Sequence, residues 1–163
     1  MKRIIILSLV VMGMLFMASC SSDDGGTNST VEVDAWVGTW LSAGPNVAPL
    51  LVALFNYDSV RVELTEQNTV KTSSHVKDGA WNTVEGTFAV TESASGDVHT
   101  VKFVYAAFEQ EGIFQIIDAT PDTLKLEVVQ TLPDIGATPR TEATGFGSDP
   151  ALGTFNIQYY VKE

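Results

Sequence analysis

The sequence predicts an all-β domain, an eight-stranded antiparallel up-and-down β-barrel with one short capping helix. Three observations lead to it: eight segments in which apolar and polar residues alternate, turn-forming residues between most of them, and one stretch with helical spacing. Alternation buries one face of a strand and wets the other, and short connections join neighbouring antiparallel strands. A closed barrel leaves no sheet edge exposed. A two-sheet β-sandwich with the same strands is the alternative.

The N-terminus has the pattern of a secretory leader. Lys2 and Arg3 give it a positive start, residues 4–16 form a short apolar core, and small residues precede Cys20. This is the organisation of a signal peptide. The apolar run is shorter than the roughly 20 residues that a membrane-spanning helix needs. We therefore predict a signal peptide over residues 1–19.

The segment Met17-Ala18-Ser19-Cys20 resembles the lipobox of bacterial lipoproteins, with Met17 in the place where Leu is usual. The resemblance implies a lipid on the Cys20 sulfur and acylation of the new amino group. Two or more lipid chains anchor a protein stably to a membrane. The alternative is an ordinary leader with an incidental cysteine. Because Cys20 is the only cysteine in the chain, we expect a domain without a disulfide.

Residues 20–33 are predicted to form a flexible tether behind the lipidated cysteine. The stretch 21–30 is polar, rich in Gly and Ser, and contains no apolar residue. Within it, Ser21-Ser22-Asp23-Asp24 resembles the acidic stretch of surface-exported lipoproteins of the Bacteroidetes. That resemblance implies an outer-membrane lipoprotein displayed at the cell surface. A generic solvated linker is the alternative.

The charge of the mature chain excludes one class of partner. Loss of Lys2 and Arg3 leaves seven of the nine basic residues against twenty acidic ones, a formal net charge of −13. Binding to nucleic acid needs clustered Lys and Arg. The sequence contains no such cluster, so we expect no nucleic-acid partner.

The predicted barrel domain spans residues 34–163. Its eight strands share the alternating pattern and are expected at 36–42, 58–66, 69–76, 83–92, 98–108, 113–119, 123–131 and 154–162. Turn residues separate several of them, and Asp78-Gly79 is the strongest turn pair in the chain. In the last strand, the alternation places Phe155, Ile157, Tyr159 and Val161 on the apolar face. Gln158 and Tyr160 are then expected to face water.

Two segments interrupt the series of strands. Residues 46–56 place apolar side chains at helical spacing, with Asn46 as the expected N-cap and Pro49 in the first turn. Residues 132–153 contain three prolines and four glycines and are predicted to form a long surface loop. Loops of this length are often functional or disordered, and the sequence does not choose between the two.

The segment Gly38-Thr39-Trp40 resembles the Gly-x-Trp signature that opens lipocalins and their relatives. Residues 120–126 are similar to the turn and strand of small lipocalin-like lipoproteins of the Bacteroidetes. The resemblance implies a barrel that holds a small hydrophobic ligand, with Trp40 packed across the closed end and Gly38 allowing close approach of the chain.

Fatty-acid-binding proteins share the Gly-Thr-Trp strand followed by helix, and they end in an Arg-x-Tyr strand whose Arg anchors a carboxylate. Gln158 and Tyr160 occupy those two positions here. Gln hydrogen-bonds a carboxylate but does not neutralise it. Because both residues are also expected to face water, we favour the broader lipocalin-like interpretation over one specific for fatty acids.

The leading hypothesis for function is binding of a small, largely apolar ligand by a lipoprotein anchored in the membrane through Cys20. The candidate lining residues are Leu51, Leu54, Phe55, Phe103, Tyr105, Ile116 and Leu126. One alternative is an interaction lipoprotein of an outer-membrane complex, with a filled barrel and loop 132–153 as its contact surface. Another is glycan binding through an exposed Trp81, although we expect Trp81 to plug a barrel end.

The sequence contains no pattern that indicates catalysis, and we expect no enzyme activity and no cofactor. Nucleophilic catalysis needs a Ser or Cys poised beside a base, and no such elbow motif occurs. His75 and His99 stand far apart in sequence and match no zinc-binding spacing, so no metal site is predicted.

Overall fold

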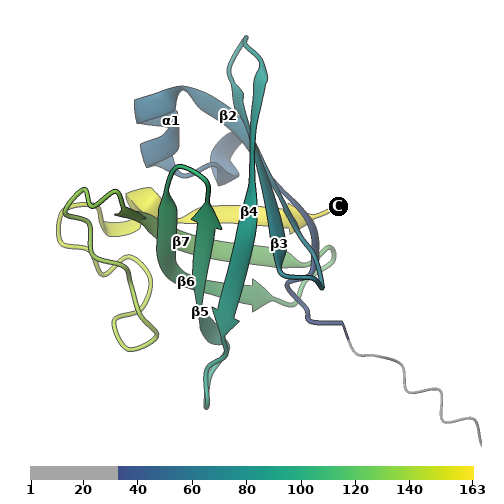
Figure 1. Cartoon of the computed structure of the whole chain (residues 1–163), viewed down its shortest axis with the longest axis vertical. Helices are drawn as coiled ribbons and strands as arrows, with labels where there is room; N and C mark the ends of the chain where they lie inside the picture. The colour runs from purple at the N-terminus through teal and green to yellow at the C-terminus, as the bar shows by residue number, and fades with distance from the viewer. Residues whose placement is uncertain (1–32) are drawn as a thin grey trace, which may run out of the picture. The chain divides into compact units, whose positions relative to one another are not determined.

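Eight antiparallel strands close into a barrel in which β8 pairs back with β1 (Figure 1). The structure is a computed structural model, and it describes residues 33–163. The strands are β1 (Gly38–Ala43), β2 (Tyr57–Leu64), β3 (Thr69–Val76), β4 (Trp81–Thr91), β5 (Val98–Tyr105), β6 (Glu109–Ile117), β7 (Thr123–Leu132) and β8 (Gln158–Lys162). The predicted up-and-down barrel is confirmed, and the sandwich alternative is wrong. Cys20 and the predicted leader lie outside the described residues.

The one α-helix within residues 33–163, α1 (Pro49–Phe55), lies in the connection between β1 and β2, after the short 3-10 helix η1 (Gly44–Asn46). The predicted helix exists, but its predicted cap is wrong. Asn46 lies in η1, and Ala48 precedes α1 without a side-chain cap. Pro49 supplies the first helical position, where its missing N–H costs nothing. Within residues 33–163, no helix is long and apolar enough to cross a membrane.

The barrel has two ends, which we call the floor and the mouth. The floor is the end where the chain enters at residue 33 and where the turns β2–β3, β4–β5 and β6–β7 lie. The mouth is formed by α1, by the turns β3–β4 and β5–β6, and by residues 133–157, which join β7 to β8 and are called the long connection. The long connection includes a second 3-10 helix, η2 (Gly153–Asn156), and runs along one side of the barrel in Figure 1.

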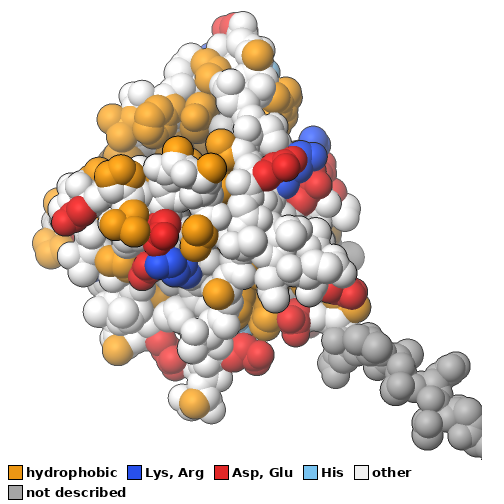
Figure 2. Space-filling model, in the orientation of Figure 1, with side chains coloured by type: hydrophobic (Ala, Val, Ile, Leu, Met, Phe, Trp, Pro, Cys, Tyr) orange, Lys and Arg blue, Asp and Glu red, His pale blue; other side chains and the backbone are white. Residues whose placement is uncertain are grey.

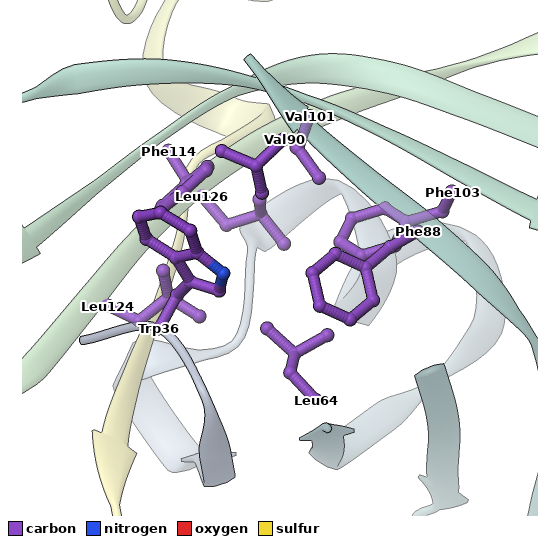
Figure 3. A pocket seen from close by; sticks show the side chains of 9 residues that line it. All are labelled: Trp36, Leu64, Phe88, Val90, Val101, Phe103, Phe114, Leu124 and Leu126. Atoms are coloured by element: carbon purple, nitrogen blue, oxygen red, sulfur yellow. The ribbon is translucent and has the colours of Figure 1, made fainter. Parts of the chain in front are cut away.

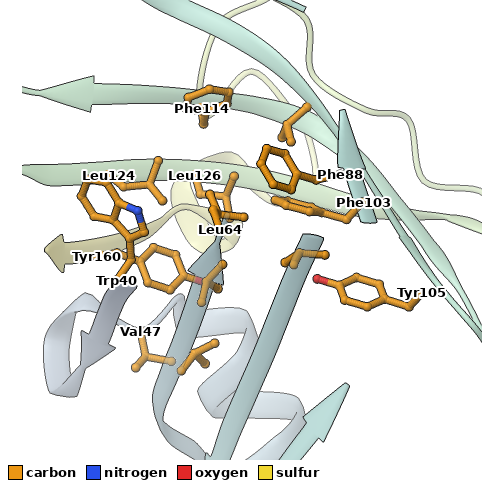
Figure 4. Packing of buried hydrophobic residues seen from close by; sticks show 14 residues of the cluster. Trp40, Val47, Leu64, Phe88, Phe103, Tyr105, Phe114, Leu124, Leu126 and Tyr160 are labelled. Carbon is orange, nitrogen blue, oxygen red and sulfur yellow. The ribbon is translucent and has the colours of Figure 1, made fainter. Parts of the chain in front are cut away.

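Trp40 anchors the floor. Its side chain is fully buried (0% exposed), its Nε1 donates a hydrogen bond to the carbonyl oxygen of Trp36 at 2.8 Å, and Lys162 Nζ lies 5.1 Å from the ring centroid. Figure 4 shows Trp40 beside Leu124 and Tyr160 in the buried cluster. Trp40 therefore takes the position at the closed end that the Gly-x-Trp resemblance implies.

A second tryptophan, Trp36, completes the packing of the floor. The Trp36 ring packs against Phe114 and His99, with ring centroids 5.7 and 5.8 Å away. Around it, Figure 3 shows a ring of apolar side chains that includes Leu64 and Phe88. The gap that they leave is about 10 Å³, barely the space of one water molecule. The floor is thus packed solid.

Gly38 has a structural reason to be glycine. Its φ of +142° is unfavourable for a side chain, and a Cβ there would lie 3.0 Å from Cε of Lys162. The absence of a side chain lets the Lys162 stem pass beside the first strand and reach the Trp40 ring. This is the close approach that the resemblance implies for Gly38.

The orientation of β8 differs from the prediction. Gln158 and Tyr160 point into the barrel, with 5% and 2% of their surfaces exposed, whereas Tyr159 is outside and Phe155 lies in η2 before the strand. The reason is that both faces of this segment are covered. Ile157 is buried on the outside, next to Gly147 of the long connection. Apolar alternation identifies the inner face of a strand only when the other face is wet.

Candidate functional site

The mouth half of the barrel contains a cavity of about 470 Å³. Pockets for small molecules measure about 300–1,000 Å³. Its apolar lining consists of Leu50, Leu51, Leu54, Phe55, Val60, Val62, Val84, Phe103, Phe108, Leu126, Val128, Val129, Ile135, Ala137 and Leu152. Its polar lining consists of Thr72, Ser74, Asn82, Gln110, Gln130, Asn156, Gln158 and the tyrosines Tyr57, Tyr105 and Tyr160.

Six of the seven residues predicted to line a ligand site surround this cavity. These are Leu51, Leu54, Phe55, Phe103, Tyr105 and Leu126. Ile116 does not line it. It packs against the floor side of the buried cluster and pairs with Leu124 across the β6–β7 ladder. The two long strands β6 and β7 span both halves of the barrel, so inward orientation alone does not say which half a residue serves.

Helix α1 forms one wall of the mouth. Its C-terminus is closed by Asn56 in the left-handed conformation (φ 55°), whose N–H bonds to the carbonyl of Val52. Apolar side chains from the helix line the cavity, yet Leu54 remains 65% exposed. No charged residue occurs between Asp34 and Asp58. Figure 2 shows hydrophobic side chains gathered over the position of α1.

The long connection forms a neighbouring wall, with its η2 segment in contact with α1, and it is held by specific bonds. Asp149 Oδ1 accepts hydrogen bonds from the backbone N–H groups of Ala151 and Leu152, and its other oxygen lies 3.4 Å from the Arg140 guanidinium. These bonds lower the pKa of Asp149 below its usual value, the two backbone N–H groups having the larger effect. Glu127, buried on the outer face of β7, accepts a bond from the Gly147 N–H.

Fixed in this way, the long connection places Ile135, Ala137 and Leu152 against the cavity. Residues 133–152 form the loop that the sequence predicts for this region. The structure adds that this loop is a wall of the site and not only a surface feature. The Gly and Pro content of the segment gives no signal of that role.

Uncharged polar groups lie among the apolar lining of the cavity. The Tyr105 and Thr72 hydroxyls are 2.8 Å apart, and the Asn156 side chain donates to the Val128 carbonyl at 2.7 Å. Burial raises the pKa of both Tyr105 and Tyr160, so both phenols stay neutral. None of the described residues that line the cavity is Asp, Glu, Lys, Arg or His. The site can therefore offer hydrogen bonds but no formal charge.

Sequence reasoning missed most of these polar residues, although a signal was present for some of them. Thr72 and Ser74 follow Val70 at spacing two and so share its inward face. A polar residue at an inward-facing position of a barrel strand indicates either a buried hydrogen bond or a cavity. For Gln158 and Tyr160 the apolar pattern of the segment pointed to the wrong face.

Outside the barrel, Trp81 belongs to a separate cluster at the start of β4. It is 44% exposed, so the prediction that it plugs a barrel end is wrong. The His75 ring lies 5.1 Å from it, and the Arg61 guanidinium 5.6 Å. His75 Nδ1 is 2.6 Å from Asp58 Oδ1, and this hydrogen bond is the largest cause that lowers the pKa of Asp58. No group of three or more potential metal ligands occurs within residues 33–163.

Comparison of the chain with models of protein families, with curated proteins and with solved structures finds no match. The likeness to lipocalins is therefore a likeness of fold: an eight-stranded closed antiparallel barrel with a tryptophan floor.

Proposed function

We propose that the protein binds a small, largely apolar ligand in the mouth cavity and is anchored to a membrane by lipid on Cys20. The observation that carries the first part is the unequal packing of the barrel. Protein interiors are packed as densely as organic crystals, with few voids larger than a water molecule. A cavity of about 470 Å³, lined mostly by apolar side chains, departs from that rule and is suited to a guest.

The chain enters the domain at the end of the barrel away from the cavity, and this is compatible with an anchor on Cys20. The first described residues lie at the floor, where Trp36 packs, and the cavity lies in the other half of the barrel. Only residues 21–32 lie between Cys20 and this point in the sequence. A lipid on Cys20 would thus be joined to the domain through the chain that enters at the floor and not at the mouth. We propose accordingly an outer-membrane lipoprotein that captures its ligand through the mouth.

The ligand proposal is tested by filling the cavity. Val128 points into it, whereas Val104 lies on the outer face of β5, so Val128→Trp and Val104→Trp form a matched pair. We expect native mass spectrometry of the protein purified from its own cell to show a co-purified small molecule with the unaltered chain and with Val104→Trp. We expect its loss with Val128→Trp. Absence of any bound molecule in all three would contradict the proposal.

The anchor proposal has an independent test. Cells that express the full chain are supplied with radiolabelled palmitate, and the protein is isolated and fractionated. We expect label and membrane association in the unaltered chain and loss of both after Cys20→Ala. Label that persists in the variant would refute lipidation at this residue. This experiment does not depend on the state of the cavity.

A second candidate function, glycan binding on the outer wall, rests on the exposure of Trp81. Sugars stack on accessible aromatic rings, and the neighbouring Arg61 and Asp58 side chains offer polar partners. Against it, Arg61 is already paired with Glu163 at 2.7 Å. Glycan-array binding that disappears with Trp81→Ala would support this function. The alternative of an interaction protein assumed a barrel filled by side chains. The cavity of about 470 Å³ in the mouth half does not agree with that assumption.

A further inference from the structure

We infer that the ligand carries an uncharged hydrogen-bonding group, such as a hydroxyl or an ester or amide carbonyl, and that this group is received by Gln158 inside the barrel. The inference rests on the proposed function, because it assigns a chemical class to the ligand of the same cavity. It singles out neutral amphiphiles from the carboxylates and ammonium compounds that have the same hydrocarbon chain.

The first argument is the chemistry of the lining. Burial of a charge is strongly unfavourable unless an opposite charge or several hydrogen bonds compensate it. The described residues around the cavity supply hydroxyl and carboxamide groups and no ionisable group other than tyrosine. Burial keeps the Tyr105 and Tyr160 phenols in their neutral form. A carboxylate or an ammonium group would therefore enter without a counter-charge.

The second argument is an unsatisfied group within the cavity wall. Gln158 opens β8 opposite Leu126, its side chain lines the cavity, and 5% of its surface is exposed. Its Nε2 is buried and has no hydrogen-bond partner. Buried polar side chains nearly always form a hydrogen bond. A buried group without one in a residue that lines a cavity therefore suggests that a ligand supplies the missing partner.

Two of the other four amide side chains that line the cavity are already engaged. Asn156 donates to the carbonyl of Val128, and Gln130 donates to the carbonyl of Pro133. Gln158 differs from them because nothing within the described chain satisfies its donor. The terminal torsion of a Gln side chain is broad and roughly two-fold, so rotation about it can exchange the positions of Nε2 and Oε1 and present either one to the cavity. Gln158 is thus able to donate to a carbonyl or hydroxyl oxygen and to accept from a hydroxyl.

The depth of Gln158 places the polar group of the ligand inside the barrel. Its neighbours on the inner surface are Leu126 and Tyr160, and both belong to the buried cluster. A ligand that satisfies Gln158 therefore buries its polar group and directs part of its hydrocarbon toward α1. A charged group at the same depth would be fully desolvated.

The test uses the mature full chain and four probes with one hydrocarbon length: dodecanol, methyl dodecanoate, dodecanoate and dodecylammonium. Isothermal titration calorimetry at neutral pH measures each affinity. We expect the alcohol and the ester to bind at least about tenfold more tightly than the two ions, a difference well within reach of one unpaired charge. Tighter binding of either ion would overturn this inference and leave the proposed function standing. Binding of none of the four would remove both.

Variants locate the recognition at Gln158. Gln158→Leu is expected to keep binding of dodecane but to lose the preference for dodecanol and methyl dodecanoate over it. Gln158→Arg is expected to reverse the order and favour dodecanoate. Gln115→Leu, on the outer face of β6, is the matched control and should leave all four affinities unchanged. Circular dichroism and melting temperature verify that each variant folds. A preference that survives Gln158→Leu in a folded protein would refute the role of Gln158.

Discussion

The floor and the mouth of this barrel are made from the same eight strands but are packed in opposite ways. At the floor, Trp36, three phenylalanines and the surrounding aliphatic side chains leave about 10 Å³ unfilled. At the mouth, the same inner surface encloses about 470 Å³ and carries uncharged polar groups. The difference indicates that the two ends have different roles. The floor stabilises the barrel, and the mouth keeps a cavity in which a ligand could bind.

The segments that cover the two ends of the barrel also differ in how they are held. The floor is closed by the short segment before β1, which Trp40 holds through its hydrogen bond to Trp36. The mouth is bounded by α1, whose Leu54 is largely in water, and by the long connection, which depends on polar contacts such as that between Asp149 and its neighbours. Apolar burial therefore fixes one end, and local hydrogen bonds fix the other.

Truncation of one apolar side chain at each end gives the largest contrast. Trp40→Ala removes a fully buried ring, so we expect a loss of about 3–5 kcal/mol in the free energy of unfolding. Leu54→Ala removes a mostly exposed side chain and should cost less than about 0.5 kcal/mol. Urea denaturation monitored by circular dichroism measures both. Similar costs for the two variants would contradict the division between floor and mouth.

A glycine where the two halves meet should give the next effect. Gly112 lies between Gln110, which lines the cavity, and Phe114, which packs in the floor. A Cβ at Gly112 would lie 2.0 Å from the backbone oxygen of Glu127, so the strands must move apart to accept it. We expect Gly112→Ala to destabilise the fold by about 1–3 kcal/mol or more.

Gly96→Ala is the control for that experiment. A Cβ at Gly96, in the β4–β5 turn, meets only ordinary contacts, with Ser93 Oγ at 3.4 Å and Glu142 Oε1 at 3.7 Å. We expect its melting temperature to stay close to that of the unaltered chain. An equal drop for Gly96→Ala would show that the close strand approach at Gly112 is not the cause.

Much of the scaffold could be predicted from the sequence because its signals are local. Strand alternation, the Asp78-Gly79 turn and the Gly38-x-Trp40 start each depend on neighbouring residues, and the barrel follows from their number and order. Six of the seven predicted lining residues border the mouth cavity; three follow from the helical spacing of residues 46–56 and three from strand alternation. Ile116 shows the limit of this reasoning, because strand alternation tells which side chains point inward but not whether they lie at the floor or at the mouth.

The polar residues of the cavity could not be predicted, because their orientation depends on tertiary contacts. Gln158 faces inward only because the long connection covers the outer side of the preceding residue, Ile157, which removes the contrast between a wet and a dry face. Trp81 shows the reverse, since an aromatic residue near a turn was expected to be buried and instead lies on the outer wall beside His75. Both cases depend on which segments pack together across long sequence distances.

Within the mouth, the hydrogen bond between Tyr105 and Thr72 provides a finer test. Tyr105→Phe removes a hydroxyl that lies 2.8 Å from Thr72 Oγ1 and leaves the ring in place. We expect a loss of about 0.5–1.5 kcal/mol in unfolding free energy, because a partly buried hydrogen bond is lost while packing is kept. Tyr159→Phe, on the outer face, should have no measurable effect. An equal change in both would show that the cavity hydroxyl is not structurally engaged.

The smallest expected effect is a local one and depends on pH. The pKa of Asp149 is lowered by the backbone N–H groups of Ala151 and Leu152, so the carboxylate stabilises the long connection in its ionised form. This contribution is complete above the ordinary value of 3.8 and is lost as the pH falls through the lowered pKa. We expect hydrogen exchange at Leu152 to accelerate in that acid range, while amides of the floor strands stay protected. Asp149→Asn should exchange faster at neutral pH and show no further acid step, whereas Asp122→Asn, in the β6–β7 turn at the floor, should behave like the unaltered chain. If the acid step appeared first in the floor strands, the mouth would not be the end that depends on charge and local hydrogen bonds.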